Sequence, residues 1–429
     1  MSARSNLALS RNIWIGIVFF LLSVAPGLWS PALVNILTSY EALWVLPYAS
    51  AVGPLVAIFS SLVFASLADR KYEAQKLLGM LSISGAVLLY MAFTSLEWGW
   101  HPWWFVIFQG MNAFIAAPMW ALLTKIALVH AKNSDRDFPL FRLWGTVGWI
   151  FAGVLVSWLA LDSSAMAGQI GGGVRVIIGL ACFMLPSTPP ARNLGKATFS
   201  QKLGLDALVL LKEKQLRVYF IASALLAIPL FSHYMYAPKL LKELNAVDTG
   251  DYKIWITSCL PAESAQMTLG QFTEIGAMLL MSWWGARAKL KWLVSISMLL
   301  AVVRFASYAL AGHFGIVAWM WLGISLHGPV YTFFSITGQM FVDRRVPDHM
   351  RAQAQALLAL LGGSLGGVIG SFACGFLYDQ TAGKQSEGYK MFMAWSVFWW
   401  VLACCVLVCL MYFLTGFRSE EKSEEVTSE

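Results

Sequence analysis

Charged residues are scarce in this chain of 429 residues, of which they make up only 12%. Soluble globular domains carry about a quarter of their residues as Asp, Glu, Lys and Arg. An ordinary soluble protein is therefore excluded, and 58% of the residues are hydrophobic instead. This composition predicts a protein that exposes most of its surface to lipid.

Motifs for enzymatic or metal chemistry are also missing. The chain has no GxxxxGK[ST] sequence, the phosphate-binding loop of ATP-driven pumps. Its six cysteines show no metal-ligand spacing with histidine, and five of them fall in apolar stretches, where Cys behaves as a small hydrophobic residue. We expect no enzymatic activity, no metal and no cofactor.

Long apolar runs take the place of these motifs. A helix needs about 20 apolar residues to cross a bilayer, and such runs recur along most of the chain. They predict an all-α polytopic membrane protein with twelve transmembrane helices, at residues 13–37, 43–67, 76–96, 102–128, 139–161, 164–185, 216–238, 264–286, 291–312, 316–341, 352–378 and 388–415.

Basic residues are distributed unevenly around these spans. Of the 30 Lys and Arg residues, 22 fall on the side that holds both termini, 5 fall on the other side, and 3 lie inside spans (Arg142, Arg175 and Arg304). Loops rich in Lys and Arg stay in the cytoplasm. We therefore expect a multi-pass protein of a bacterial inner (plasma) membrane with both termini cytoplasmic. The net charge of +7 then reflects topology and not binding to nucleic acid.

The longest connection between spans, residues 186–215, divides the chain in two. Before it lies an N-terminal six-helix half, 1–185, and after it a C-terminal six-helix half, 216–415. The connection is expected in the cytoplasm, and its LGLDALVLLKEK stretch favours a short interfacial helix. We expect the largest outer loop at 239–263 and a disordered, acidic, cytoplasmic tail at 416–429.

Two six-helix halves around a long cytoplasmic connection resemble the major facilitator superfamily, in which the solute binds near the midplane between the halves. The segment ASLADRK supports this, because its Asp69 and Arg70 are similar to the superfamily's GxxxDR loop signature. Ala65 stands where Gly is usual. The resemblance implies a gating role for Asp69 and Arg70.

Polar residues inside the spans are the candidates for function, because a charge there costs about 2.5–3.5 kcal/mol. Glu274 is the one acidic residue well inside a span, and Gln271 shares its helix face. Arg142, Thr146 and Trp149 share a face of the fifth span. The remaining candidates are Gln109 and Asn112 in the fourth span, His233, Tyr234 and Tyr236 in the seventh, and His327, Tyr331, Thr332 and Ser335 in the tenth.

Each candidate also has a structural interpretation. Arg142 and Glu274 could form a pair that joins two helices, and the aromatic residues could serve packing. Asn112 and Gln109 could hydrogen-bond between helices. Together, however, an acid, a base, histidines, amides and aromatics in the middle of several spans are typical of a binding site for a polar, ring-bearing solute.

Several segments resemble the nucleoside:proton symporters of the major facilitator superfamily, the bacterial nucleoside permeases. DFPLFRLWGTVGW is similar to the family's DFPxxRxWGTxGF, GQFTE to its SQxSE, and NAFIAAP to its NxFxxxP. LGLDA, VVRF and RAQAQ match in the same order along the chain. The resemblance implies that Arg142, Thr146, Gln271 and Glu274 bind the solute or couple protons, with Trp149 in place of a usual Phe.

Other segments depart from the family. The tenth span reads HGPVYTFFS where the family resembles YGxxFDFFN, so Thr332 replaces an acid and His327 a Tyr. In the seventh span Phe231 and Tyr234 stand where the family has a QxxN pair. The first span keeps only PGLW of the family's QFxxWGxW pattern. The fold is thus more firmly implied than the solute.

We therefore expect a monomeric transporter that takes up a nucleoside, or a similar polar ring solute, together with protons by alternating access. Glu274, with Arg142, would carry the proton. The alternatives are a carrier or exporter of a sugar or other metabolite on the same scaffold, and a non-transporting membrane sensor. The candidates for solute binding are Arg142, Thr146, Trp149, Gln271, Tyr331, Thr332, His327, Tyr234 and Asn112.

Overall fold

The computed structural model of the chain describes residues 3–70, 72–131, 134–190, 205–284, 289–347, 350–385 and 388–417. Over these residues it consists of helices and connections, without a strand. The N-terminal elements are α1 (Ala3–Gly27), α2 (Leu33–Ser39), η1 (Leu43–Val45), α3 (Leu46–Arg70), α4 (Ala74–Glu97), α5 (Trp103–Ala116), α6 (Met119–His130), α7 (Ser134–Trp158), α8 (Met166–Ala181) and η2 (Cys182–Met184).

The C-terminal elements begin with the 3₁₀-helix η3 (Leu205–Lys212), which falls on the predicted interfacial helix. Two of them, η4 and η6, are π-helical. In order they are α10 (Lys214–Leu230), α11 (Ser232–Val247), α12 (Lys253–Cys259), α13 (Glu263–Met267), α14 (Leu269–Trp284), α15 (Leu290–Phe314), α16 (Ala318–Ser325), α17 (His327–Tyr331), η4 (Thr332–Ile336), α18 (Thr337–Arg345), α19 (Arg351–Leu358), η6 (Ala359–Leu365), α20 (Gly366–Gln380), η7 (Ala382–Lys384) and α21 (Gly388–Gly416).

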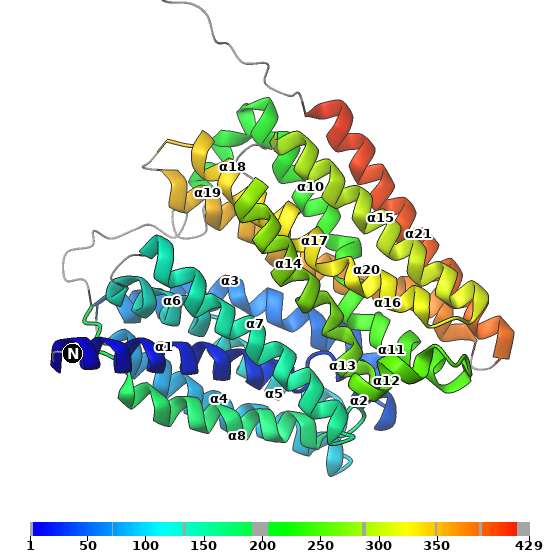
Figure 1. Ribbon diagram of the computed structural model, residues 1–429, viewed down its shortest axis with the longest axis horizontal. Helices are drawn as coiled ribbons and strands as arrows, with labels where there is room; N and C mark the ends of the chain where they lie inside the picture. The colour runs from blue at the N-terminus through cyan, green and yellow to red at the C-terminus, as the bar shows by residue number, and fades with distance from the viewer. Residues whose placement is uncertain are drawn as a thin grey trace, which may run out of the picture.

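The helices form two groups that meet at one end. Helices α1 to α8 pack against one another, as do α10 to α21. The two groups contact each other through α2 and α11, α7 and α13, and α3 and α20. Away from this joined end they diverge, toward the end that carries the N-terminus, α18 and α19 (Figure 1).

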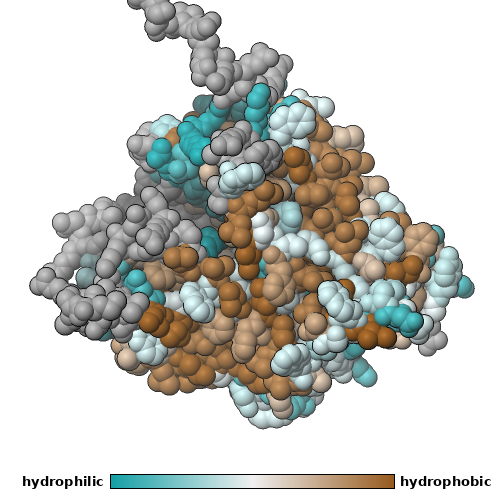
Figure 2. All heavy atoms as spheres, in the orientation of Figure 1, coloured by the Kyte–Doolittle hydropathy of each residue, from teal (hydrophilic) through white to brown (hydrophobic). Residues whose placement is uncertain are grey.

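The surface of the helices is suited to lipid. Nine stretches of the described residues are long and apolar enough to cross a membrane. Figure 2 shows hydrophobic residues over most of the visible face, with hydrophilic residues gathered near α18 and α19. The fold is that of a multi-pass, all-helical membrane protein.

Several spans that the sequence predicts as continuous are interrupted. The span predicted at 13–37 is wrong at its end, because α1 stops at Gly27 and α2 is a separate helix. The outer connection predicted at 239–263 is largely helical, since α11 runs to Val247 and α12 occupies Lys253–Cys259. The eighth span divides into α13 and α14, and the tenth and eleventh contain η4 and η6. Hydropathy alone does not register such breaks.

Proline explains the break in the fourth span. Pro118, which lies between α5 and α6, has no backbone N–H, so the carbonyl of Phe114 four residues earlier loses its helical partner. The hydroxyl of Ser60 on α3 donates to that carbonyl at 2.5 Å. A neighbouring helix thereby satisfies the freed backbone group, as the membrane interior requires.

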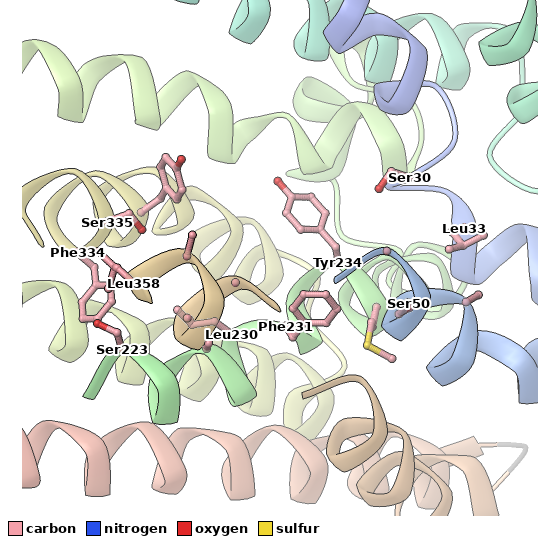
Figure 3. A pocket seen from close by; sticks show the side chains of 18 of the residues that line it. Ser30, Leu33, Ser50, Ser223, Leu230, Phe231, Tyr234, Phe334, Ser335 and Leu358 are labelled. Atoms are coloured by element: carbon pink, nitrogen blue, oxygen red, sulfur yellow. The ribbon is translucent and has the colours of Figure 1, made fainter. Parts of the chain in front are cut away.

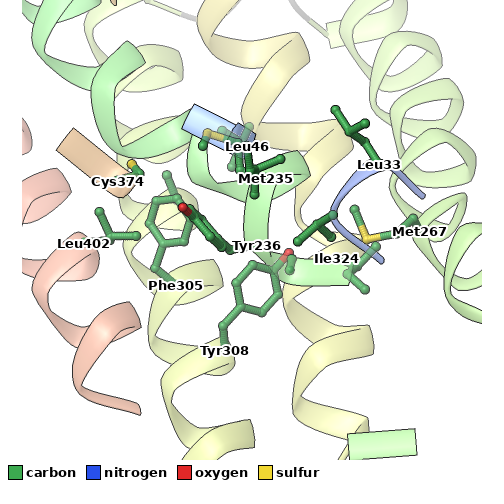
Figure 4. Packing of buried hydrophobic residues seen from close by; sticks show 14 of the residues in the cluster. Leu33, Leu46, Met235, Tyr236, Met267, Phe305, Tyr308, Ile324, Cys374 and Leu402 are labelled. Carbon is green, nitrogen blue, oxygen red and sulfur yellow. The ribbon is translucent and has the colours of Figure 1, made fainter. Parts of the chain in front are cut away.

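Apolar side chains from both groups meet at the joined end. Figure 4 shows Leu33 and Leu46 of the N-terminal group beside Met235, Met267 and Ile324 of the C-terminal group. All of these are buried. Burial of each such side chain is worth about 1.5–3 kcal/mol in water, and inside a bilayer close packing takes over this role.

Two hydrogen bonds from backbone N–H groups also join the two helix groups at this end. Asp162, in the connection after α7, accepts a hydrogen bond from the backbone N–H of Ser264 at 2.7 Å. The hydroxyl of Ser157 accepts one from the backbone N–H of Ala265 at 2.9 Å. Both acceptors belong to the N-terminal group and both donors to α13. Together these two bonds are the joined-end clasp.

Arg175, which no sequence motif accounts for, serves packing between α4, α5 and α8. It is 6% exposed and donates to the side-chain oxygen of Asn112, which in turn donates to Gln109 at 3.1 Å. Asn112 was a candidate for solute binding. In the structure it is buried against Arg175 and is not part of the cavity lining described below.

Gly85 leaves the space that Arg175 occupies. A Cβ on Gly85 of α4 would lie 2.5 Å from the Nη1 atom of Arg175. We expect Gly85→Ala to displace the guanidinium and to destabilise the protein by about 1–3 kcal/mol, the usual cost of overpacking. Gly173→Ala, on α8, is the control, because a Cβ there meets no atom within 4 Å. Equal melting temperatures of the two variants in detergent would contradict this account of Arg175.

Candidate functional site

A cavity of about 620 Å³ lies between the two helix groups. Ser30 and Tyr234 extend into it from opposite groups, and Ser335 lies farther along it (Figure 3). Its polar lining consists of Ser30, Ser50, Gln109, Tyr219, Ser223, Tyr234, Tyr331, Ser335, Gln339 and Gln355. A cavity of this size and mixed character fits a small polar solute with a ring.

Two of the predicted binding residues, Tyr234 and Tyr331, line this cavity. Trp149, Gln271 and His327 contact Tyr234. The Gln271 amide donates to the Tyr234 hydroxyl at 2.9 Å, and that hydroxyl lies 3.4 Å from Nε2 of His327. The Trp149 ring meets the Tyr234 ring edge-on at 6.2 Å. Tyr234 therefore joins three predicted residues to the cavity wall.

The His327 ring is stacked between two other rings. Tyr331 lies one turn later, with its ring centre 6.3 Å away and nearly parallel. On α11, His233 stacks on His327 at 4.9 Å. The Tyr308 hydroxyl lies 2.9 Å from Nδ1 of His233, and it accepts a hydrogen bond from Nε of Arg304 at 3.4 Å. A buried polar chain thus runs from the cavity wall to α15.

Sequence reasoning missed Tyr308 and any role for Arg304. The two residues are four apart on α15 and so share a helix face. This spacing, together with the charge of Arg304 inside a span, was the available signal. Their partner His233 was noticed, but no sequence pattern places it against His327.

Glu274 lies at a crossing of α14 and α17 that proline helps to form. Pro329 has no N–H to donate to the carbonyl of Ser325, four residues earlier. The Thr273 hydroxyl on α14 donates to this carbonyl at 2.6 Å. The bond therefore fixes α14 to the start of α17 one residue before Glu274.

Two glycines allow this close crossing. A Cβ on Gly328 of α17 would overlap the backbone of Glu274, so only hydrogen fits there. On the other helix of the crossing, a Cβ on Gly270 of α14 would lie 3.0 Å from the Cβ of His327. The crossing thus holds Glu274 and His327 in a fixed relation to each other.

Arg142 and Glu274 face each other less closely than a buried ion pair would. Helices α7 and α14 are in contact, and the charge of Arg142 acts on the half-buried Glu274 carboxyl. The Arg142 side chain is exposed, however, and no described carboxylate forms an ion pair with it. Thr146, one turn after Arg142, is half-buried.

The remaining candidates lie away from the cavity or outside the description. Thr332 is fully buried in η4, its hydroxyl has no hydrogen-bond partner, and it does not line the cavity. Asp69 and Arg70 close α3, and their side chains lie outside the described residues.

Two helix groups that enclose a polar cavity inside a membrane-spanning fold define a membrane transporter and not an enzyme. A sequence model described as nucleoside H+ symporter matches residues 11–422. The chain belongs to this family, whose members couple nucleoside uptake to protons.

Individual relatives agree with this assignment. YegT of Escherichia coli (strain K12), named as a nucleoside transporter, is 30% identical over 396 residues, which cover 89% of this chain and 87% of YegT. The nucleoside permease NupG of the same organism is 27% identical over 374 residues, 85% of each chain. The crystal structure of NupG superposes with a TM-score of 0.81 at 24% identity, covering 95% of this chain and 99% of NupG. This last likeness concerns the fold.

Gly328 tests whether the crossing positions Glu274. We expect Gly328→Ala to push the Glu274 backbone away and to reduce proton-driven uptake roughly tenfold or more, because small misplacements of a reacting group are costly. Uptake into proteoliposomes and melting temperature should be measured together. Gly276→Ala, on α14 two residues after Glu274, is the control, since a Cβ there meets no atom within 4 Å. Full uptake in the Gly328 variant would disprove the role of the crossing.

Proposed function

We propose that this protein imports a nucleoside with protons by alternating access, as a monomer with twelve transmembrane helices in two halves, 1–185 and 216–415. The hydrogen-bonded chain from Gln271 through Tyr234 to His327 carries this proposal. It places an amide, a phenol and an imidazole at one cavity wall. Gln271, which supplies the amide, lies three residues before the acid Glu274 on α14. Such a wall offers both hydrogen bonds and ring faces to a nucleoside base.

In this proposal the base binds against Tyr234, with Trp149 or Tyr331 on its face. The side-chain oxygen of Gln271 supports this, because it is buried and has no hydrogen-bond partner in the protein. A buried acceptor without a partner costs about 1–3 kcal/mol, and a donor on the solute would remove that cost. Thr146 and Arg142 would contact the solute from α7.

Glu274 would carry the coupling proton. Its carboxyl is half-buried in a span and experiences the charge of Arg142 from the opposite helix group. Protonation of Glu274 would remove the attraction between its carboxyl and the Arg142 guanidinium. Arg142 would then be free to bind the solute or a new partner. Asp69 and Arg70, at the end of α3, would act in gating.

Glu274→Gln tests the coupling, since glutamine has the shape of a protonated carboxyl. We expect the variant to bind nucleoside and to exchange it across proteoliposome membranes. We expect it to lose all net accumulation under a proton gradient. Labelled nucleoside uptake, with and without the gradient, measures both properties.

Three further results interpret this test. Arg142→Ala should impair exchange as well, because it removes the partner of the acid. Accumulation that persists unchanged in Glu274→Gln would leave Arg142 and Glu274 with a structural role. Accumulation of a sugar in place of nucleosides would support the alternative carrier.

The proposal places both termini in the cytoplasm, so that the diverging ends of the two groups, and the cavity between them, face inward. Lys214, at the start of α10, would then lie inside and Lys384, in η7, outside; both side chains are exposed. Cysteines introduced at each position should be tested in a background in which the exposed Cys259, Cys404 and Cys405 are replaced by serine.

In sealed right-side-out vesicles, a membrane-impermeant maleimide should label Lys384→Cys and not Lys214→Cys, because only the outer side is accessible to it. Permeabilised vesicles provide the control, in which both positions should react. The reverse pattern in sealed vesicles would overturn the orientation.

A further inference from the structure

The hydrogen-bond chain behind Tyr234 has a defined direction. Arginine has donors and no acceptor, so the Nε–H of Arg304 donates to the Tyr308 hydroxyl, whose own hydrogen then points to Nδ1 of His233. In the same way the Gln271 amide donates to Tyr234, whose hydrogen points to Nε2 of His327. Each neutral histidine therefore carries its hydrogen on the other ring nitrogen.

Two donors behind the wall consequently lack acceptors, whereas the side-chain oxygen of Gln271 is an acceptor that lacks a donor. Nδ1 of His327 has no hydrogen-bond partner, and neither has Nη2 of Arg304. Buried polar atoms in proteins almost always have a partner, so unpaired donors of this kind are unusual. Negative charge and acceptor oxygens on a bound group would offset this excess of donors without direct contact to Arg304.

The wall is also positively charged. Arg304 is only 2% exposed, and no carboxylate among the described residues forms an ion pair with it. Its guanidinium lies instead over the rings of Phe305, at 5.5 Å, and Tyr308, at 6.0 Å. A buried charge without a counter-ion is costly, and an anion nearby would offset that cost.

Contacts link Arg304 to the cavity. Arg304 bonds to Tyr308, which bonds to His233, and the His233 ring meets the ring of Tyr234, which lines the cavity, at 4.7 Å. The other charged group on this side is Glu274 of α14, and Arg142 of α7 faces it from the opposite helix group. Arg142 is thus the cation that faces this acid, and Arg304 is the cation behind the cavity wall.

We propose that this wall selects a nucleoside whose base is an anion with acceptor oxygens over its uncharged analogue, with Arg304 as the residue that determines the selectivity. The inference rests on the proposed function, because it concerns the same solute site. Arg304 acts through its field and through the Tyr308–His233 bond, and does not itself touch the solute.

A matched pair of nucleosides tests the selectivity. Xanthosine loses a ring proton near neutral pH, whereas inosine, which lacks one oxygen of that base, stays neutral. Equilibrium binding of both to the purified full-length protein should be measured at about pH 5 and about pH 8. A unit charge at about 10 Å and an effective dielectric constant of about 20 changes affinity roughly tenfold. We therefore expect the preference for xanthosine over inosine to rise roughly tenfold between the two pH values.

Inosine controls for changes of the site that affect both ligands alike. Because an ionised Glu274 would repel the anion alone, the comparison is repeated in Glu274→Gln. Arg304→Lys should keep the rise in preference because it keeps the charge, and Arg304→Gln should abolish it. Where Arg304→Gln fails to fold, Thr332→Asp replaces it, since η4 packs on α15 and the new carboxylate would cancel the charge. A preference that does not change with pH in the wild-type protein would overturn the selectivity and leave nucleoside transport intact. Failure to bind either nucleoside would instead refute the proposed function.

Discussion

The arrangement of the candidate site depends on the crossing of α14 and α17. The carbonyl of Ser325, which Pro329 frees, accepts the Thr273 hydroxyl, and Gly328 admits the backbone of Glu274. This contact sets the distance between the acid and His327. Because Gln271 is on the same helix as Glu274 and bonds to Tyr234, any shift of the acid along or around α14 also disturbs the cavity wall. Glu274 and this wall of the cavity are therefore held by one connected set of contacts.

Each charge inside a span is accommodated in a different way. Arg175 donates to Asn112. Arg304 donates to the Tyr308 hydroxyl and lies over the rings of Phe305 and Tyr308. Glu274 faces the charge of Arg142 on the other helix group. The first arrangement involves only helices of the N-terminal group and meets the cavity lining only through Gln109, which accepts a hydrogen bond from Asn112. The other two lie at or behind the cavity wall, where a charge can act on a solute.

The sequence predicts the all-helical membrane fold because repeated apolar runs of about 20 residues match the thickness of a bilayer and are rare in soluble proteins. It also predicts the position of Gln271 three residues before Glu274, since both lie within one helix. It does not predict that Thr273 bonds to Ser325, because the two residues are far apart in the chain and the bond requires a carbonyl that only the folded proline segment exposes. For the same reason Asn112 looked like a solute ligand, although the folded chain pairs it with Arg175.

The joined-end clasp has a consequence for evolution. Asp162 and Ser157 bind the backbone of α13, so the donors at Ser264 and Ala265 remain whichever side chains those two positions carry. The clasp therefore does not restrict which side chains occur at these two positions, except that it excludes proline, which has no backbone N–H to donate. Correlated substitutions between the two halves of the chain would be absent at this contact. A search for paired mutations would overlook the bonds that hold the joined ends of the two helix groups together.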